Sequence, residues 1–422
     1  MRERRLTFGG RLLCPFLRPF FLSPDDERRV IGAAEMMWRL GERVASAASD
    51  RPDLLDELAL NEDEVRLARI DPGYGVASTA ARADAFLLPD SLRFAEYNAE
   101  SPAGAGYSQR LAELFDGEPL MGAFRRDFDT RFYTPIPRLL DALLESYRDW
   151  GGTARPPRIA IVDWREVPTW SEFELLRDAF GAIGVPTVVA DPRDLVFDGS
   201  RLFAGGEAID LVYRRVLIND VVARADECRA LVHAYAKGAV CVANTFRCKL
   251  PHKKALFAVL TDERFDALFD RQELAAIRAH VPWTRVVRDV PATRDGWTVG
   301  LLDYLRARQT DFVIKPNDEY GGTGVTLGWE ISASEWDTAI ERAVSGAHGT
   351  WVAQERIAIR RERFPVCEDD AIREREMLVD FAPYLFRGHL AGFLTRLSAT
   401  GLANVTSGGG QVPAFVVSPR LP

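Results

Sequence analysis

Hydrophobic and polar positions first follow a helical period along this chain. The segment that begins at Ser23 and Pro24 is a typical helix start, because serine can cap a helix and proline suits its first turn. Apolar residues then recur at helical spacing, which predicts an amphipathic helix to about Ala48 with one buried face. The next expected elements are a second helical region at 53–70 and two strands, 83–88 and 92–97, joined by a short turn.

From residue 158 to residue 243 the pattern changes to short apolar strands that alternate with helical stretches. A helix is expected at 172–183, and strands are expected at 158–163, 186–190, 209–213 and 239–242. This alternation predicts a small α/β layer built on a parallel sheet. No Gly-x-Gly-x-x-Gly turn follows any of these strands, so a dinucleotide-binding fold is not expected.

The last part of the chain favours longer strands that look antiparallel. A short buried strand at 312–314 comes first, followed by an expected helix at 335–344 and strands at 351–357, 373–381, 389–397 and 412–417. The whole pattern therefore predicts an α+β fold that carries an α/β subdomain.

Composition and charge exclude several classes of function. A chain of 422 residues with 47% hydrophobic and 27% charged residues is typical of a globular protein. A net charge of −8 and a pI near 5.4 argue against nucleic-acid binding, and the apolar stretch 12–22 is too short to cross a membrane. Five cysteines without a Cys-x-x-Cys pair indicate neither a disulfide framework nor a zinc site, so the cytoplasm is the expected location.

The first candidate for chemistry is a lysine that precedes a glycine-rich loop. Lys315 stands at the end of the strand at 312–314, and Gly321, Gly322, Thr323 and Gly324 follow within ten residues. Glycine lets backbone N–H groups approach an anion closely, and a lysine beside them offsets phosphate charge. The lysine precedes the glycines and the P-loop ending is absent, so the segment predicts a nucleotide-phosphate site of a different kind.

A second candidate lies on the two strands near the amino end. Glu96 and Asn98 are two residues apart, so on a strand their side chains share a face and can offer oxygen ligands to one cation. Arg82 and Asp84 have the same spacing on the preceding strand. If the two strands pair, Asp84 becomes a third oxygen ligand and Arg82 can reach a phosphoryl group. Such hard oxygen ligands suit Mg²⁺ bound with nucleotide phosphates.

These motifs together resemble those of the ATP-grasp superfamily. Its ligases place an acid on one strand and Glu-x-Asn on the next, and the glutathione-synthetase-like members continue into a Ser-Pro or Thr-Pro turn, here Ser101-Pro102. The acids usually follow the lysines and the glycine loop, whereas here they precede them. That order is similar to the circularly permuted ATP-grasp proteins, the group that contains the glutathionylspermidine synthases. The match runs from Arg82 onward, and the first seventy residues match nothing.

The resemblance implies roles for further residues. Lys254 resembles the first ATP lysine, with Lys253 as the rival candidate, and Lys315 resembles the second. The glycine loop resembles the lid over the phosphates, and Arg396 resembles an arginine that stabilises developing negative charge, as Arg82 would. The implied adenine-binding residues are Gln354, Glu355 and Arg356, and the residues implied or expected on the substrate side are Ser101, Arg214, Arg215, Asn404, Ser407 and Gly408.

The resemblance also implies a fold and a domain division. Two α+β lobes would clamp ATP in a circularly permuted ATP-grasp fold, beside a small Rossmann-like (pre-ATP-grasp) layer with a parallel sheet. The expected divisions are an N-terminal helical region at 1–75, a metal-binding part at 76–150, the α/β substrate layer at 151–245, and the remaining ATP-grasp lobes at 246–422.

The implied activity is an ATP-dependent carboxylate–amine ligase that works through an acyl phosphate with two Mg²⁺ ions. The alternatives are a phosphotransferase on the same site and a non-catalytic nucleotide-binding or scaffold protein. Small-molecule or peptide carboxylates and amines are the expected partners, without nucleic acid or membrane, and a homodimer is the default expectation. An extra amidase domain of the kind some glutathionylspermidine synthases carry does not fit into this length, so glutathione and spermidine do not follow as substrates.

Overall fold

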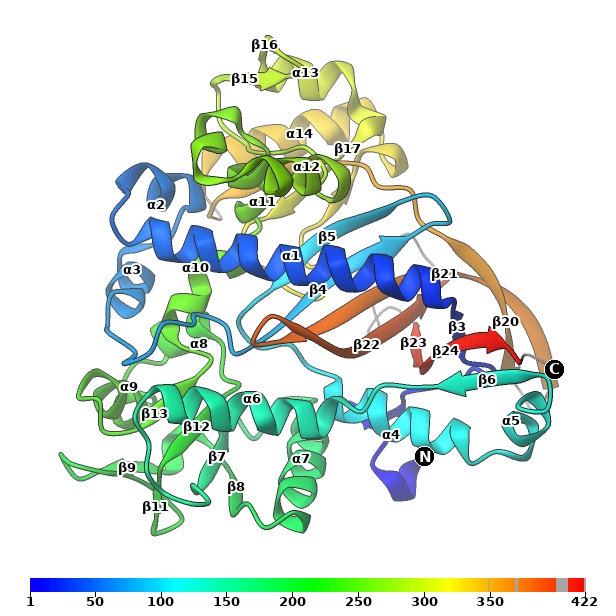
Figure 1. Ribbon diagram of the computed structural model, residues 1–422. Helices are drawn as coiled ribbons and strands as arrows, with labels where there is room; N and C mark the ends of the chain where they lie inside the picture. The colour runs from blue at the N-terminus through cyan, green and yellow to red at the C-terminus, as the bar shows by residue number, and fades with distance from the viewer. Residues whose placement is uncertain (348, 369–370, 400–408, 421–422) are drawn as a thin grey trace.

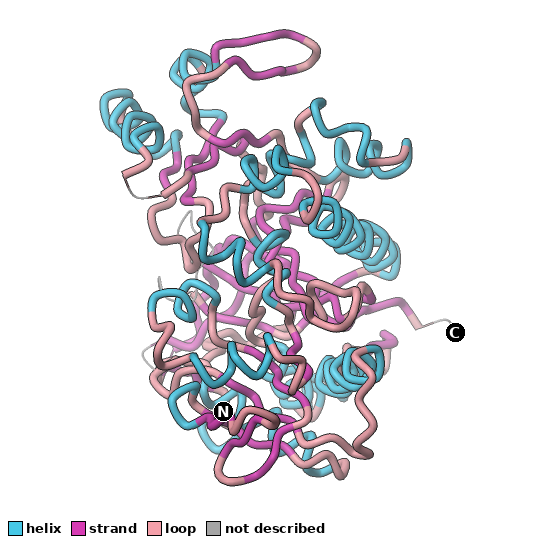
Figure 2. The backbone as a smooth tube through the Cα atoms, turned by 90° about the vertical axis from the view of Figure 1, so that its left-hand side faces the viewer, coloured by secondary structure: helices cyan, strands magenta, loops and turns pink. Residues whose placement is uncertain are grey.

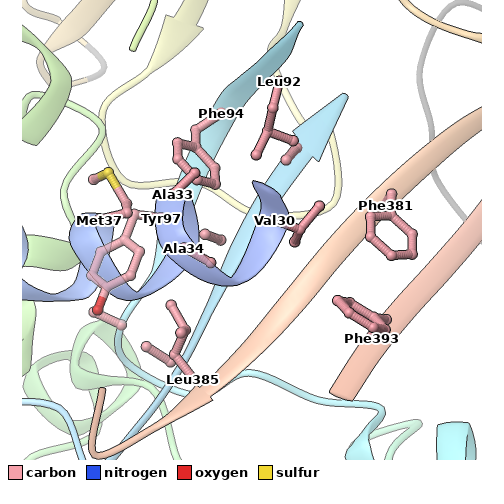
Figure 3. Packing of buried hydrophobic residues seen from close by; sticks show 14 of the residues in the cluster. Val30, Ala33, Ala34, Met37, Leu92, Phe94, Tyr97, Phe381, Leu385 and Phe393 are labelled. Atoms are coloured by element: carbon pink, nitrogen blue, oxygen red, sulfur yellow. The ribbon is translucent and has the colours of Figure 1, made fainter. Parts of the chain in front are cut away.

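The long helix expected after Ser23 forms and lies across a large antiparallel sheet (Figure 1). A computed structural model of the chain describes residues 1–347, 349–368, 371–399 and 409–420. Helix α1 spans Pro24–Ala48, and the Ser23 side chain accepts a hydrogen bond from the backbone N–H of Asp26, as a cap should. Its apolar face, with Val30 and Met37, packs over aromatic side chains of the sheet beneath it (Figure 3). The helix therefore closes one side of the main core.

The antiparallel sheet joins strands from both ends of the sequence. Its order is β23-β22-β21-β4-β5, with β20 also paired to β21. The bounds are β4 Ala80–Leu87, β5 Leu92–Asn98, β20 Arg361–Glu368, β21 Ala371–Phe386, β22 His389–Ser398 and β23 Gly410–Val412. Strands β4 and β5 form the predicted antiparallel hairpin, and this confirms that Asp84 lies opposite Glu96 and Arg82 opposite Asn98. Residues nearly three hundred positions apart thus share one sheet.

A smaller sheet lies beside the first and carries the glycine loop. Its order is β14-β19-β17-β18, with bounds β14 Thr284–Val286, β17 Phe312–Pro316, β18 Thr326–Leu327 and β19 Trp351–Glu355. The helices and the hairpin around it are α11 Leu256–Thr261, α12 Arg271–His280, α13 Leu301–Ala307, α14 Ala333–Ser345, β15 Pro291–Arg294 and β16 Trp297–Gly300. This lobe forms the top of the molecule in both views, with the β15–β16 hairpin outermost (Figures 1 and 2).

The strands expected between residues 158 and 243 form a parallel sheet in the order β13-β12-β7-β8. Its elements are β7 Ile159–Val162, α7 Trp170–Ala182, β8 Thr187–Ala190, β12 Leu211–Arg214, α8 Ile218–Ala223, α9 Arg229–Ala236 and β13 Cys241–Ala243. A small antiparallel meander is inserted between β8 and β12 and consists of β9 Leu195–Phe197, β10 Leu202–Ala204 and β11 Glu207–Ile209. The layer lies at the opposite end of the molecule from the glycine loop's sheet (Figure 1).

Two expected elements differ from the structure. The helical region at 53–70 is two helices, α2 Pro52–Leu58 and α3 Glu62–Ala68, because Ala59 takes a left-handed conformation and Asn61 then caps a new helix. The strand at 412–417 is broken at Pro413, so β23 and β24 (Ala414–Pro419) belong to different sheets. Near Lys249 the chain forms only a short turn of helix, α10 Lys249–His252, which is separated from α11.

The remaining elements complete the surface and the amino end. They are α4 Ala105–Asp116, α5 Pro119–Phe124, α6 Pro135–Asp149, β1 Thr7–Phe8, β2 Arg11–Leu12, β3 Phe20–Leu22, β6 Phe128–Arg131 and the 3₁₀ turns Arg2–Arg4, Pro192–Asp194, Phe246–Cys248, Glu263–Leu268, Gln309–Asp311 and Gly328–Glu330. Strand β24 pairs with β3 and β6, which ties the carboxyl end to the amino end. Within the described residues, none of the helices combines the length and the apolar character that crossing a bilayer requires.

Candidate functional site

A pocket between the antiparallel sheet and the glycine loop's sheet brings most of the predicted site residues together. It encloses about 990 Å³ of atom-free space, part of it open to solvent, which is within the range of small-molecule sites. The predicted residues that line it are Asp84, Glu96, Lys254, Lys315, Gly321, Gly322, Thr323, Gln354, Glu355, Arg356 and Arg396. Acids from the amino end therefore meet cations from the second half of the chain.

The two lysines reach the pocket from different elements and converge on Glu96. Lys254 lies just before α11, and its Nζ is 3.5 Å from Glu96 Oε2. Lys315 lies in β17, one residue before its end, and its Nζ donates to Gln354 Oε1 at 2.7 Å. Burial alone would raise the pKa of Glu96, but Lys254 and Lys315 outweigh it and lower that pKa, so the carboxylate stays charged. Between the two candidates for the first lysine, Lys254 lines the pocket, whereas Lys253 binds two other acids.

A further acid, Asp380, belongs to the same pocket and was missed in the sequence. It lies on β21 directly opposite Arg396 on β22, and the Arg396 guanidinium binds both Asp380 and Asp84. Burial raises the pKa of Asp380 to about 7, against the opposing effect of Arg396, and its Oδ1 atom has no hydrogen-bond partner among the residues that the structure describes. The available signal was a single carboxylate inside an otherwise apolar strand, at 377–386.

The oxygen donors at this end of the pocket fit a hard cation such as Mg²⁺. Asp84, Glu96 and Asp380 supply carboxylates, and the unpartnered Oδ1 of Asp380 is a buried oxygen that a cation would satisfy. In the described part of the chain no three acids, histidines or cysteines already surround one point closely enough to hold a metal. The carboxylates are instead paired with Arg82, Arg396 and Lys254. Binding of a cation would therefore compete with these ion pairs.

Arg82 and Asn98 lie behind the acids instead of lining the pocket. One edge of the Arg82 guanidinium binds Asp84, with Nε donating to Oδ1 at 2.7 Å and Nη2 to Oδ2 at 3.1 Å, and its Nη1 donates to the Ala103 carbonyl. The amide of Asn98 donates to Glu96 Oε1 at 3.0 Å. These contacts orient the carboxylates, and direct contact of Arg82 or Asn98 with a ligand stays a prediction.

Three of the predicted substrate residues lie in the α/β layer or against it, and the other three lie outside the described residues. Ser101 donates to the Arg215 carbonyl at 2.6 Å, and Arg215 donates to the Pro102 carbonyl and the Tyr213 hydroxyl. The Arg214 side chain is fully buried and donates to the Val216 and Asn244 carbonyls and to Cys248 Sγ. These contacts give Arg214 a packing role, and substrate binding by Ser101, Arg214 and Arg215 stays a prediction. The other predicted residues, Asn404, Ser407 and Gly408, lie outside the described residues.

The far end of the pocket has the character expected of an adenine site. Strand β19 carries Gln354 and Glu355, and the chain continues along the pocket through Arg356. The Arg356 guanidinium stacks 4.2 Å from the Trp329 ring centroid. Apolar side chains there are Val313, Leu327, Trp329, Ile357 and Ile359. Apolar walls around a few backbone and polar groups suit the flat face and polar edge of a purine.

The glycine loop depends on a conformation that only glycine adopts without strain. Gly321, Gly322 and Gly324 all have positive φ, and a Cβ on Gly324 would lie 2.7 Å from Cγ of Pro316. We expect Gly324→Ala to weaken Mg-ATP binding about tenfold or more, since it combines left-handed strain with this contact. Isothermal titration calorimetry would measure the change. Gly238→Ala is the control, because Gly238 has φ of +61° in open space on the α/β layer, and equal loss in both variants would contradict a specific role of the loop.

The charge of Lys315 predicts a pH dependence. Burial lowers the pKa of Lys315 to about 8, although Glu96 opposes the shift. Above that pH the unliganded protein loses a positive charge that would offset phosphate, so in the ATP-dependent reaction predicted from the sequence kcat/KM for ATP should fall as the pH rises from 7 to 9.5. Lys315→Arg should move this decline beyond pH 9.5, because guanidinium stays protonated. A decline at the same pH in both proteins would exclude Lys315 as its cause.

No model of a known protein family matches this sequence, and no curated protein matches it either. Among solved structures, a glutathione synthetase-like effector from Globodera pallida in its apo form matches 96% of this chain and 91% of its own, with a TM-score of 0.58 and 11% identity. A putative γ-glutamylcysteine synthetase from Methylobacillus flagellatus matches over 86% and 82% of the two chains, at a TM-score of 0.42 and 12% identity. The first likeness extends over nearly all of both chains, so this protein has a mixed α+β fold similar to that of the glutathione synthetase-like effector.

Proposed function

We propose that the protein is an ATP-dependent ligase that joins a carboxylate to an amine, built on a circularly permuted ATP-grasp fold. The observation that carries the proposal is the 3.5 Å approach of Lys254 Nζ to Glu96 Oε2 in a pocket that Lys315 and the glycine loop also line. Acids for a metal and cations for phosphates are the two components that a nucleotide triphosphate requires. Strands β4 and β5 come from the amino end yet complete the sheet of β21 and β22, which agrees with a permuted chain order.

Each residue would act through charge and position. Lys254 and Lys315 would bind the phosphates, and Arg396 would offset the negative charge that develops on the transferred phosphoryl group. Asp84, Glu96 and Asn98, with Asp380 beside them, would hold Mg²⁺, which when bound neutralises and aligns the phosphate oxygens. The glycine loop would cover the phosphates and exclude water. The γ-phosphoryl group would pass to the substrate carboxylate, and the amine would then displace phosphate to leave an amide.

The test begins with nucleotide binding and proceeds to turnover. Mg-ATP should raise the melting temperature of the wild type and of Lys237→Ala, an exposed lysine on the α/β layer, but not of Lys315→Ala. Pools of carboxylates with hydroxylamine as a general amine should then give ADP, phosphate and a hydroxamate. A phosphorylated product that forms without any requirement for an amine would indicate a phosphotransferase. Nucleotide binding without turnover would favour the scaffold alternative, and absence of nucleotide binding would contradict the proposal.

A further inference from the structure

A second cluster of charged side chains lies at the base of the glycine loop, outside the pocket. We call it the brace, and it consists of Glu64, Glu100, Lys249, Lys253 and Asp318. Lys253 Nζ lies 2.6 Å from Asp318 Oδ2 and 2.8 Å from Glu64 Oε1. Lys249 Nζ lies 2.8 Å from Asp318 Oδ1 and 3.2 Å from Glu100 Oε2. Both oxygens of Asp318 are therefore occupied by buried ammonium groups.

The brace joins four parts of the chain that are separated in sequence. Glu64 belongs to α3 in the N-terminal helical region, and its other oxygen accepts the Asn61 N–H that starts that helix. Lys249 begins α10 and Lys253 follows its last residue, Glu100 lies just after β5, and Asp318 lies between β17 and the glycines. The sequence contains only five lysines, and four of them lie in the brace or in the adjacent pocket, at 249, 253, 254 and 315. Lysine is therefore concentrated around the brace and the pocket, in a chain whose other cationic side chains are mainly arginine.

Residues 317–319 also hold Lys254 directly. The Lys254 backbone N–H donates to the Asn317 carbonyl at 3.0 Å, and its Nζ donates to the Glu319 carbonyl at 2.6 Å. The Asn317 side chain accepts from the Ala255 N–H at 2.8 Å and donates to the Leu58 carbonyl of α2 at 2.9 Å. A shift of this segment would move the phosphate lysine and the start of the glycine loop together.

We propose that the N-terminal helical region acts on the nucleotide site as a positioning element. Glu64 holds Lys253 and Glu100 holds Lys249. Both lysines hold Asp318, and Asp318 in turn fixes Lys254 and the glycine loop. This inference rests on the proposed nucleotide site and gives a role to the first seventy residues, which no motif explained. Glu64, Glu100, Lys249, Lys253 and Asp318 are positioning residues, because none of them lines the pocket.

Asp318 and Lys249 both keep their charges at neutral pH. Burial opposes ionisation of Asp318, but Lys249 and Lys253 outweigh it and lower its pKa. Burial likewise opposes the charged form of Lys249, and Glu100 and Asp318 reverse that effect and raise its pKa. Neighbouring His252 stays neutral, since burial lowers its pKa to about 4. Burial raises the pKa of Glu64, against the opposing effect of Lys253 and Lys249. The three acids of the brace lie against Lys249, Lys253 and the adjacent Arg214, and removing one partner leaves another polar group buried without it.

The test uses Glu64→Gln and Asp318→Asn, two isosteric substitutions in different parts of the brace. Each should raise the Kd for Mg-ATP about tenfold, measured by calorimetry on the full chain, while circular dichroism shows the native fold. Amide hydrogen exchange should accelerate at 254–256 and 317–319 in both variants. In a Lys254→Ala background, Glu64→Gln should change the Kd less than twofold, because the residue acts through Lys254.

Glu57→Gln is the matched control. Glu57 is a buried acid on α2, in the same N-terminal region, but its partners are Arg264 at 3.0 Å and Arg288 at 3.7 Å instead of the brace lysines. Glu57→Gln should lower the melting temperature about as much as Glu64→Gln and Asp318→Asn do. It should not raise the Kd for Mg-ATP or the exchange rate at 317–319. Unchanged exchange there in Glu64→Gln and Asp318→Asn would overturn the brace whether or not nucleotide binds. Faster exchange in a protein that binds no nucleotide would overturn the proposed function. The brace would then only stabilise the fold, and its proposed role in positioning the phosphate site would be contradicted as well.

Discussion

Replacing Glu96 by Gln should reduce ATP-dependent turnover by about 10²- to 10³-fold, the range that follows loss of one preorganised charged group. The carboxylate lies between Lys254 and Asn98 and holds its charge because the two lysines lower its pKa. The amide of the variant cannot balance either lysine or bind a cation with a full charge. ADP release under saturating ATP, measured with increasing Mg²⁺, checks the result. The apparent Mg²⁺ requirement should rise together with the loss of kcat.

A control in the same hairpin distinguishes site chemistry from damage to the sheet. Asp90→Asn changes an exposed acid in the turn between β4 and β5 and should leave turnover within twofold of the wild type. Glu96→Gln should also lower the pKa of Lys315 further, since Glu96 is the main group that opposes its burial. The alkaline decline of kcat/KM should therefore move to lower pH. Full turnover with an unchanged Mg²⁺ requirement would remove Glu96 from the metal site.

The central hairpin was predictable from sequence because its signals are local. The spacing of Asp84 and Glu96 fits one strand, a turn and a second strand, and the structure places the two residues opposite each other. Alternation of side chains along a strand then fixes which face each residue shares. Local periodicity likewise gave helix α1 and the strands of the parallel sheet.

What could not be predicted depends on packing between distant segments. Asp380 has no motif of its own, and its importance becomes visible only when β21 pairs with β22 and places it beside Arg396. Lys253 and Lys254 are adjacent in sequence, and only the contacts of Lys253 with Glu64 and Asp318 show which of the two faces the pocket. Such assignments require three-dimensional partners, which a single sequence does not contain.

Arg396→Ala, which removes the ion pairs with Asp84 and Asp380, is the second substitution for which we expect a large loss of activity. We expect kcat to fall about 10²- to 10³-fold while the Kd for ATP changes less than threefold, because the guanidinium would act mainly on charge that develops during transfer. Arg396→Lys should recover only part of the loss, since one ammonium cannot reproduce the planar fork that binds both Asp84 and Asp380. Single-turnover kinetics with saturating ATP would separate the chemical step from binding.

Loss of Arg396 should also change the response of the protein to metal in the absence of nucleotide. Asp84 and Asp380 would then face each other without their shared cation, so the variant should melt at a lower temperature in EDTA and regain stability in Mg²⁺ more than the wild type does. The control is Arg387→Ala, which removes an arginine that binds Glu145 and Asp149 outside the pocket and should lose stability equally with and without Mg²⁺. An equal Mg²⁺ response in both variants would mean that Asp84 and Asp380 do not attract the ion, and the metal would then have to be held by Glu96 and Asn98 without them.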